Sequence, residues 1–588
     1  MHTLHTKNLH TLWLVVGLWL LLTACNVLPG ASSAPAAEAT QEVVAQQIGS
    51  TPQQTVEMFL AAWNVEDFET MYSLVSPRTG DVYPFDDFVA QYRNADAEMG
   101  FEGVTYTVGD ITIQGQSAAV SYDATLESSL FGSIEDTGRV MRLVQGGGGW
   151  QIAWAPMDII NGMSSNIRLT ADRRFPARAD IVDRNGLPVV QENGSLIALY
   201  LNEQDMSNVD DCFDVLARVT LRPRGYFVRL FVDYAPETVA FVAELDTDIY
   251  EAKRSDIDNI CGAAIDGEFF GSKVVRITGR NYWGHGALAH ITGYIGRIPS
   301  ESLSFWEGRG YRASDIIGLQ GVETSMQDYL AGTPEQYLRL IEPGGIVLRE
   351  LGGASGSEPT SVTLTIDRQL QYEMAQAFND AWNYSGLDWA SVATGGAGVV
   401  LDINTGAILA LHSYPTFDPR IFNPDSAYDN AQDEISRATT GDPFLPVGPG
   451  LINRAAAEQY FPGSTFKLVT AVAAADSGIW SRDRIFDCTL EWRGAQYGDT
   501  LEVREDWRVS FGFDAAGEIT MSQAIATSCN PFFWEVGGMM YRQDPNLEVD
   551  YARLFGFGSS TRAYGLGVTE ASGTIPNPPS ATEALNYV

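Results

Sequence analysis

The sequence is poor in histidine, cysteine and basic residues, and each shortage argues against a class of function. Six histidines and five cysteines, with no C-x-x-C spacing, do not suit a cysteine/histidine zinc site, and we expect neither metal nor cofactor. Only 37 lysines and arginines stand against 74 acidic residues, and a formal charge of −37 repels the phosphate backbone of nucleic acids. The sequence has no G-x-x-x-x-G-K-[ST] loop, which argues against a nucleotide hydrolase.

The sequence also has no apolar run of the roughly 20 residues that span a bilayer. The run Leu12 to Leu22 is shorter and leads into Leu22-Thr23-Ala24-Cys25, which resembles a bacterial lipobox. We therefore predict a lipoprotein signal peptide over residues 1–25, lipidation of Cys25, and a protein anchored on the extracytoplasmic face of the cell membrane. The alternative is an ordinary signal peptide or anchor helix with an incidental cysteine.

After the leader, the patterning predicts a linker and three folded regions. Residues 26–50 are rich in Ala, Ser, Pro and Gln, which is typical of a flexible linker. Residues 51–160 begin with an amphipathic helix and continue with alternating stretches, so we expect a small α+β domain. Residues 161–360 are irregular and rich in turns. Residues 361–588 contain a strand at 361–366, a helix around 370–382 and a hairpin at Asn404-Thr405-Gly406, which indicates a mixed α/β domain.

Four cysteines fall within the folded regions. Cys212 and Cys261 could pair in an oxidising compartment, and so could Cys488 and Cys529. Connectivity cannot be read from spacing, so the sequence leaves both bridges open.

One short segment combines a nucleophile with a base. Pro462-Gly463 breaks the chain, and Ser464 then opens a helix-forming stretch with Lys467 three residues later, on the same helical face. A serine hydroxyl is a poor nucleophile until a neighbour removes its proton, and a desolvated lysine can do so without histidine. The alternative is an ordinary exposed helix start, but the apolar residues after Lys467 predict a buried helix.

A second segment, Ser528-Cys529-Asn530, follows at the end of another helical stretch. The Ser528 hydroxyl can relay a proton to a leaving amine. The Asn530 carboxamide can hold both the Lys467 amine and a substrate peptide group. Neither motif is distinctive alone; their order and spacing predict an active site.

With these motifs, the chain resembles the class B penicillin-binding proteins, the monofunctional D,D-transpeptidases that cross-link peptidoglycan. The likeness covers roughly residues 172–588. It includes Arg178-Ala179-Asp180-Ile181-Val182-Asp183-Arg184-Asn185-Gly186, in which Ala179 replaces the family's usual glycine, and the segments Gly318-Leu319-Gln320-Gly321-Val322-Glu323, Tyr329-Leu330-Ala331-Gly332, Leu364-Thr365-Ile366-Asp367 and Asn453-Arg454-Ala455. The first domain is similar to the nuclear-transport-factor-like domain of the low-affinity, methicillin-resistance type, with Trp150-Gln151-Ile152-Ala153-Trp154 as the best local match.

The resemblance implies a multidomain α+β fold: a nuclear-transport-factor-like domain over 51–160, an elongated dimerisation or pedestal domain over 161–360, and a serine β-lactamase-like α/β transpeptidase domain over 361–588. Within the pedestal, Arg178 and Glu323 are expected to be structural.

The resemblance also implies roles for the site residues. Ser464 would be the acylated nucleophile, Lys467 its general base, Ser528 the proton relay and Asn530 the substrate-positioning residue. The substrate would be a peptidoglycan stem peptide ending in D-Ala-D-Ala, and β-lactams would acylate the same serine. A membrane glycosyltransferase is a candidate partner.

One family element is missing from the sequence. The family carries K-T-G or K-S-G on the strand beside the active site, but no lysine follows Lys467 here. We therefore expect a C-terminally truncated chain with an incomplete transpeptidase domain. The missing strand would supply an oxyanion donor, whose loss costs on the order of 10²–10³ in rate, so we expect the 588 residues alone to be inactive.

Three alternatives stay open at this stage. A D,D-carboxypeptidase is a close variant of the transpeptidase. A serine β-lactamase uses the same S-x-x-K opening but hydrolyses its acyl-enzyme quickly, and a secreted hydrolase needs neither the pedestal nor the extra first domain. A non-catalytic sensor of β-lactams or wall fragments is the third.

Overall fold

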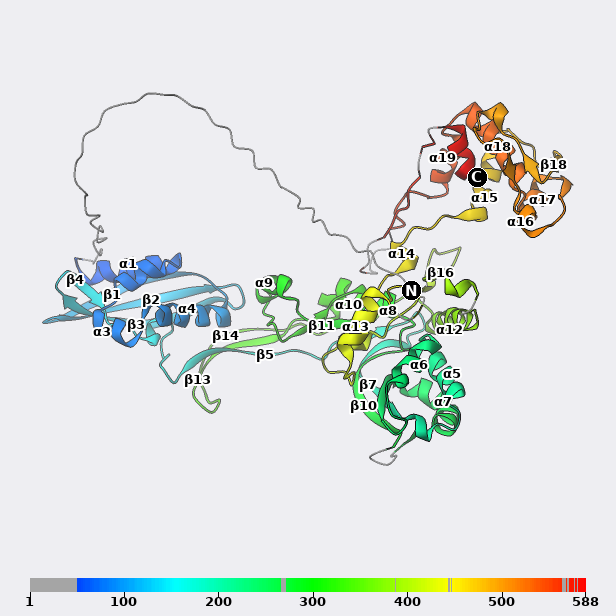
Figure 1. Ribbon diagram of the computed structural model, residues 1–588. Coiled ribbons are helices and arrows are strands. Elements are labelled where there is room, and N and C mark those ends of the chain that lie inside the picture. The colour runs from blue at the N-terminus through cyan, green and yellow to red at the C-terminus, as the bar shows by residue number, and fades with distance from the viewer. Residues whose placement is uncertain are drawn as a thin grey trace, which may run out of the picture.

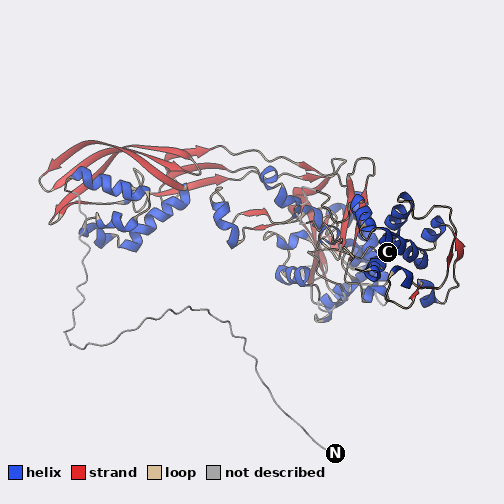
Figure 2. Cartoon of the chain, turned by 90° about the horizontal axis from the view of Figure 1, so that it is seen from above, coloured by secondary structure: helices blue, strands red, loops and turns tan. Residues whose placement is uncertain are grey.

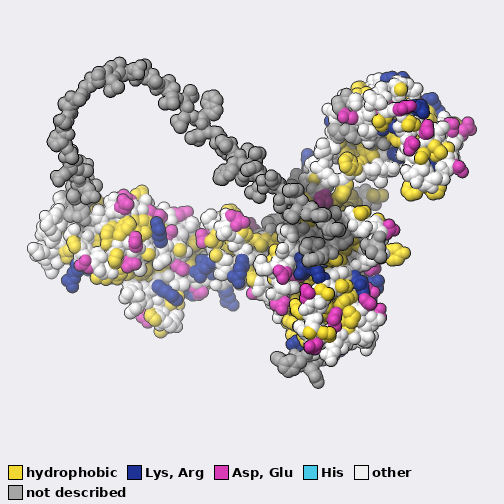
Figure 3. Space-filling model, in the orientation of Figure 1, with side chains coloured by type: hydrophobic (Ala, Val, Ile, Leu, Met, Phe, Trp, Pro, Cys, Tyr) yellow, Lys and Arg dark blue, Asp and Glu magenta, His cyan; other side chains and the backbone are white. Residues whose placement is uncertain are grey.

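The computed structural model describes residues 50–265, 271–385, 388–442, 445, 447–562, 567, 570–575, 577–578 and 580–587. The predicted signal peptide, Cys25 and most of the linker lie outside the described residues. The molecule is elongated, with the first domain at one end and the helices of the C-terminal region at the other (Figures 1 and 2). Acidic side chains are visible on every part of it (Figure 3). Among the described residues, no helix has the length and apolarity needed to cross a membrane.

The first domain packs helices against one antiparallel sheet, as the α+β prediction requires. Thr51 caps the first helix, accepting a hydrogen bond from the Gln54 amide at 3.2 Å. Phe59 and Trp63 of this helix are buried against the sheet. The elements are α1 (Pro52–Asn64), α2 (Phe68–Ser73), α3 (Pro77–Val82), α4 (Phe85–Met99), β1 (Phe101–Gln114), β2 (Ser117–Ser128), β3 (Gly132–Gly146) and β4 (Gly149–Ile152), with strand order β1-β2-β3-β4.

A three-stranded sheet joins the first domain to the pedestal. It has the order β14-β13-β5 and consists of β5 (Arg168–Arg174), β13 (Glu335–Ile341) and β14 (Val347–Ala354). Leu169 and Leu338 of this sheet belong to the same hydrophobic core as Trp63. Glu98 of α4 accepts hydrogen bonds from the Ala171 amide at 2.7 Å and from Arg312 at 3.0 Å. The first domain and this sheet therefore share one core.

The pedestal is built on a six-stranded sheet with helices packed on it. The strands are β6 (Ile181–Val182), β7 (Pro188–Leu201), β8 (Ala240–Asp246), β9 (Ala264–Ile265), β10 (Lys273–Tyr282) and β15 (Val362–Thr363). The helices that share its core are α5 (Val209–Thr220), α6 (Arg224–Val232) and α7 (Thr247–Ile260). A disulfide between Cys212 and Cys261 ties α5 to the end of α7, so this pair is bonded.

Shorter elements complete the pedestal. They are α8 (Ala289–Thr292), β11 (Ile295–Arg297), α9 (Leu303–Glu307), β12 (Ile316–Gly318), α10 (Gly321–Ser325) and α11 (Gln327–Ala331).

Arg178 and Glu323, both expected to be structural, meet in a buried ion-pair network. The Glu323 carboxylate is fully buried and accepts hydrogen bonds from Arg178 Nε and Arg280 Nε, both at 2.7 Å, and from the Tyr282 hydroxyl at 3.1 Å. Burial raises the pKa of Glu323, but the two guanidinium groups outweigh burial and leave this pKa below its ordinary value. The carboxylate is therefore charged at neutral pH and joins three separate segments of the pedestal.

Replacing Glu323 with glutamine is expected to destabilise the pedestal by about 3–5 kcal/mol, because the Arg178 guanidinium loses its counter-charge and the buried Arg280 keeps only its pair with the partly exposed Glu192. Denaturant unfolding followed by circular dichroism measures the change. Asp328→Asn is the matched control, since Asp328 pairs with Arg309 in solvent and its loss should change stability little. Equal midpoints for the two variants would contradict this account.

The C-terminal region opens with the predicted helix and hairpin. The helix is α12 (Arg368–Tyr384), and β16 (Gly396–Leu401) pairs antiparallel with β17 (Ile408–Tyr414) around the predicted turn. The strand predicted over 361–366 is shorter, since only Val362 and Thr363 pair with the pedestal sheet. Helices α13 (Ala431–Thr440) and α14 (Arg454–Ala457) follow.

Residues 463–562 and 580–587 form a helical lobe, whereas the Ala571 amide is hydrogen-bonded to Ala456 of α14. Figure 1 shows this lobe set apart from the part of the chain that contains α12 and β16, and reached through an extended stretch after α14. Its core includes Trp480, Phe532 and Val536. The elements are a 3₁₀ turn (Gly463–Thr465), α15 (Lys467–Asp476), β18 (Phe486–Cys488), β19 (Glu491–Trp492), β20 (Arg504–Glu505), α16 (Trp507–Phe511), β21 (Gly517–Ile519), α17 (Met521–Ala526), α18 (Asn530–Gln543), α19 (Leu547–Leu554) and α20 (Ala581–Tyr587).

Candidate active site

Ser464 and Lys467 lie where the chain enters the helical lobe. Ser464 is in the 3₁₀ turn and is exposed, whereas Lys467 is the first residue of α15 and is only 4% exposed. The sequence predicted that Ser464 itself lies in the first helical turn; the structure places it just before, because Gly463 (φ 56°) starts a tighter turn. The helix buries one side and exposes Leu468 and Val472 on the other.

The structure brings all four predicted site residues together. Lys467 Nζ donates to the Ser528 hydroxyl and the Ser528 carbonyl, both at 3.1 Å, and to Asn530 Oδ1. The Ser528 hydroxyl in turn donates to Ser464 Oγ at 3.0 Å. Ser528 thus links the candidate nucleophile to the amine by two hydrogen bonds, a link that the motif spacing did not indicate.

The surroundings of Lys467 favour its neutral form. Burial lowers the pKa of Lys467 to about 8; the charge of Asp506 opposes this shift and that of Arg508 adds to it. The Phe533 ring, whose centre lies 5.3 Å from the amine, favours the protonated form, but burial outweighs it. At neutral pH a fraction of the molecules therefore carries an uncharged amine, which can accept a proton.

Two features lie behind the site: Asp506, which the sequence did not indicate, and the Cys488–Cys529 bridge, which the sequence left open. Asp506, almost fully buried, accepts a hydrogen bond from the Asn530 amide at 2.9 Å and pairs with Arg508 at 2.7 Å. Cys529, inside the Ser528–Asn530 segment, is bonded to Cys488 of β18. The cysteine was visible in the motif, but its partner could not be chosen; Asp506 has no distinctive spacing to mark it.

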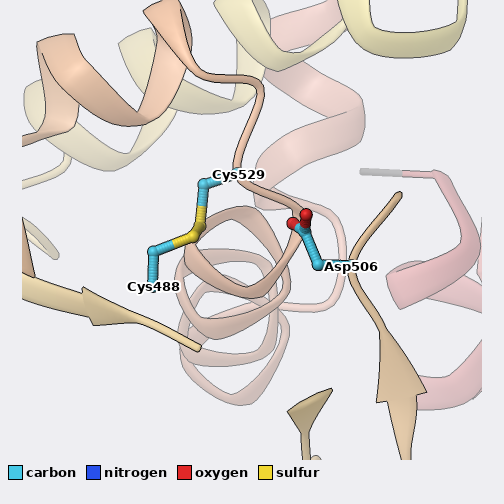
Figure 4. Close-up of side chains that lie close together, drawn as sticks. All are labelled: Cys488, Asp506 and Cys529. Carbon is cyan, nitrogen blue, oxygen red and sulfur yellow. A yellow bond between two sulfur atoms is a disulfide. The ribbon is translucent and has the colours of Figure 1, made fainter. Parts of the chain in front are cut away.

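A metal is not needed to explain this cluster. Ligand atoms of Cys488, Asp506 and Cys529 lie within 4.8 Å of one another, the spacing of a metal site. The two sulfurs are bonded to each other, however, so neither is a thiolate ligand. Figure 4 shows the disulfide and the Asp506 carboxylate beside the same stretch of chain.

Three family models match the chain, in the order of the domains described above. Residues 51–166 match the NTF2-like N-terminal transpeptidase domain, residues 173–364 the penicillin-binding protein dimerisation domain, and residues 396–585 the penicillin-binding protein transpeptidase domain. The fold class predicted from the sequence is thereby confirmed. These matches give the chain the domain composition of a class B penicillin-binding protein.

Curated proteins are similar to a large part of this chain. The chain is 28% identical over 420 residues to the peptidoglycan D,D-transpeptidase MrdA of Acinetobacter baumannii, covering 68% of this chain and 54% of the relative. It is 25% identical over 407 residues to MrdA of Escherichia coli K12, covering 68% and 58%. It is 21% identical over 492 residues to penicillin-binding protein 3 of Bacillus subtilis, covering 82% and 67%. The chain therefore spans little more than half the length of the two MrdA relatives.

A solved structure also aligns with the chain. Its title is "Structural coordination of polymerization and crosslinking by a peptidoglycan synthase complex". The TM-score is 0.47 at 23% identity, covering 72% of this chain and 67% of that one.

Proposed function

We propose that this chain is a serine D,D-transpeptidase that cross-links peptidoglycan through an acyl-enzyme on Ser464. The observation that carries the proposal is the hydrogen-bonded series Ser464–Ser528–Lys467, which ends on a buried amine of lowered pKa. The MrdA relatives are named D,D-transpeptidases, and the transpeptidase family model covers this segment.

In the proposed acylation, the neutral Lys467 amine takes the proton of Ser464 Oγ, with Ser528 between them. Ser464 Oγ then bonds to the penultimate carbonyl carbon of a stem peptide ending in D-Ala-D-Ala. When the tetrahedral intermediate collapses, the C–N bond breaks, and the proton passes from Lys467 through Ser528 to the leaving amine of D-Ala. Asn530 positions both the Lys467 amine and the substrate peptide group.

In the second half-reaction, an amine on a neighbouring peptidoglycan strand attacks the Ser464 ester. The new amide forms, the ester bond breaks, and Ser464 recovers its proton. A β-lactam would acylate Ser464 by the same first step, since its strained amide takes the place of the stem-peptide carbonyl.

The proposed location of the protein in the cell is inferred from the lipobox-like segment that ends at Cys25. Lipidation of Cys25 would hold the protein on the extracytoplasmic face of the membrane, where stem peptides and a glycosyltransferase partner are found. The first domain would correspond to that of the low-affinity, methicillin-resistance type, and the NTF2-like match over residues 51–166 supports this reading.

Labelling with a fluorescent penicillin, followed by peptide mapping, tests the proposal. Residues 1–588 hold no lysine after Lys467, so a K-T-G element is not among them. The test uses the protein as its gene encodes it. We expect one labelled peptide, containing Ser464, with an adduct that persists through electrophoresis. Rapid loss of the adduct would instead indicate a β-lactamase, and release of D-Ala without cross-linking a D,D-carboxypeptidase.

The acylation rate is expected to rise with pH. Lys467 must be neutral to accept the proton, and its pKa of about 8 means that the neutral fraction grows about tenfold between pH 7 and pH 9. The second-order rate constant for fluorescent penicillin, measured from pH 6 to pH 10, should show a midpoint near 8. A flat profile across this range would show that Lys467 is not the base.

A further inference from the structure

The segment Thr527–Asn530 is held from outside at each of its residues. Ser528 has a φ of 51°, a left-handed conformation that a serine adopts only when its surroundings fix it. The Thr527 carbonyl accepts a hydrogen bond from Arg508 at 2.7 Å, and the Ser528 carbonyl accepts one from Lys467. This turn presents both the Ser528 hydroxyl and the Asn530 carboxamide to the lysine.

A disulfide holds the middle of the turn. Cys529 stands between the two functional residues and is bonded to Cys488, the last residue of β18. That strand pairs with β21, and both sulfurs lie in the core of the helical lobe with Phe532. A covalent link to a paired, buried strand limits how far Ser528 and Asn530 can move.

Asp506 holds the end of the turn. Its Oδ2 accepts the Asn530 amide at 2.9 Å, while its Oδ1 accepts from Arg508, from the backbone amide at 3.1 Å and from the side chain at 2.7 Å. Both carboxylate oxygens are therefore occupied by donors. Figure 4 shows Cys488, the last residue of β18, and Asp506, which follows β20 (Arg504–Glu505), on either side of the Cys529 segment.

We propose that the Cys488–Cys529 disulfide and Asp506 are positioning groups for acylation, holding the Ser528–Asn530 turn at hydrogen-bonding distance from the Lys467 amine. None of the three residues touches Ser464, so each acts through the turn. The inference rests on the proposed function, because it concerns the rate at which Ser464 is acylated.

Asp506 has a second effect on the site through its charge. The negative carboxylate favours the protonated amine of Lys467, and the positive Arg508 guanidinium disfavours it. Glu548 of α19 also packs on α15, the helix that begins at Lys467, and accepts a hydrogen bond from Thr470. Burial raises the pKa of Glu548 to about 7. Removing the Asp506 carboxylate leaves the positive Arg508 guanidinium without its paired charge, so both changes lower the pKa of Lys467.

The disulfide is tested with the double variant Cys488→Ala/Cys529→Ala of the complete gene product. Loosening the turn is expected to lower the rate constant for fluorescent penicillin about 10- to 100-fold, since a displacement of about 1 Å can cost 10² in rate. The matched control, Cys212→Ala/Cys261→Ala, removes the other disulfide, in the pedestal, and should acylate at the parental rate. Parental acylation by the Cys488/Cys529 variant would overturn the role of the disulfide.

Asp506 is tested with Asp506→Asn and Asp506→Glu, which also serve if the cysteine variant does not fold. Both are expected to lower the plateau rate constant, because one loses a hydrogen bond and the other displaces the carboxylate. Only Asp506→Asn removes the charge, so only in it should the midpoint of the pH–rate profile fall. Unchanged rate and midpoint in Asp506→Asn would overturn the role of Asp506, whereas a parent protein that takes up no penicillin would refute the proposed function itself.

Discussion

Replacing Ser464 with alanine is expected to abolish covalent labelling of the complete gene product by fluorescent penicillin. The adduct is an ester on Ser464 Oγ, an atom that alanine lacks, and the neighbouring hydroxyl is that of Ser528 on a separate segment. The Ser528 hydroxyl is half-buried and already engaged with Lys467 at 3.1 Å. In-gel fluorescence at saturating penicillin measures the effect, which should be complete rather than partial.

A neighbouring hydroxyl supplies the control. Thr465 is also exposed, but its Oγ1 donates to the Pro462 carbonyl and has no hydrogen bond to Lys467 or Ser528 among the described residues. Thr465→Ala should therefore be labelled like the parent. Labelling of Ser464→Ala at the parental level would place the nucleophile elsewhere and refute the assignment.

Replacing Lys467 with alanine is expected to slow acylation by about 10²–10⁴-fold, the usual contribution of a general base. The loss has two parts: no group remains to take the Ser464 proton, and Ser528 and Asn530 both lose the donor that orients them. Stopped-flow or gel-based labelling with a fluorescent penicillin gives the rate constant.

A second variant separates the effect of the positive charge of Lys467 from the effect of its ability to accept a proton. Lys467→Arg keeps a positive donor near Ser528 but cannot become neutral, so it should acylate as slowly as the alanine variant. The rise of rate with pH should also disappear in both variants. Acylation of Lys467→Ala at the parental rate would refute the mechanism.

The sequence predicted the members of the site better than their arrangement. Ser464 and Lys467 are neighbours on one local segment, and local spacing predicts which side chains share a face. The hydrogen-bonded link from Ser464 through Ser528 to Lys467 depends on how α15 and α17 pack together. No local sequence pattern predicts this packing. The role of Asp506 is harder still to predict, because it depends on the Asn530 backbone amide, 24 residues away in the chain.

The same distinction holds for the fold. The hairpin at Asn404-Thr405-Gly406 was predictable because both strands flank a turn signal. The sheet β14-β13-β5 could not be predicted, because β5 and β13 are far apart in the sequence and the residues of neither strand indicate which strand it pairs with. The bridges Cys212–Cys261 and Cys488–Cys529 likewise required the fold to bring each pair together.

The sheet that joins the first domain to the pedestal has a mechanical consequence. β5 runs antiparallel to β13 over its whole length, from Arg168 opposite Ile341 to Arg174 opposite Glu335. β5 is also the covalent connection from the first domain into the pedestal, and its hydrogen bonds to β13 along its whole length resist bending of this connection. A pull on the N-terminal end would thus reach the pedestal through a stiff link.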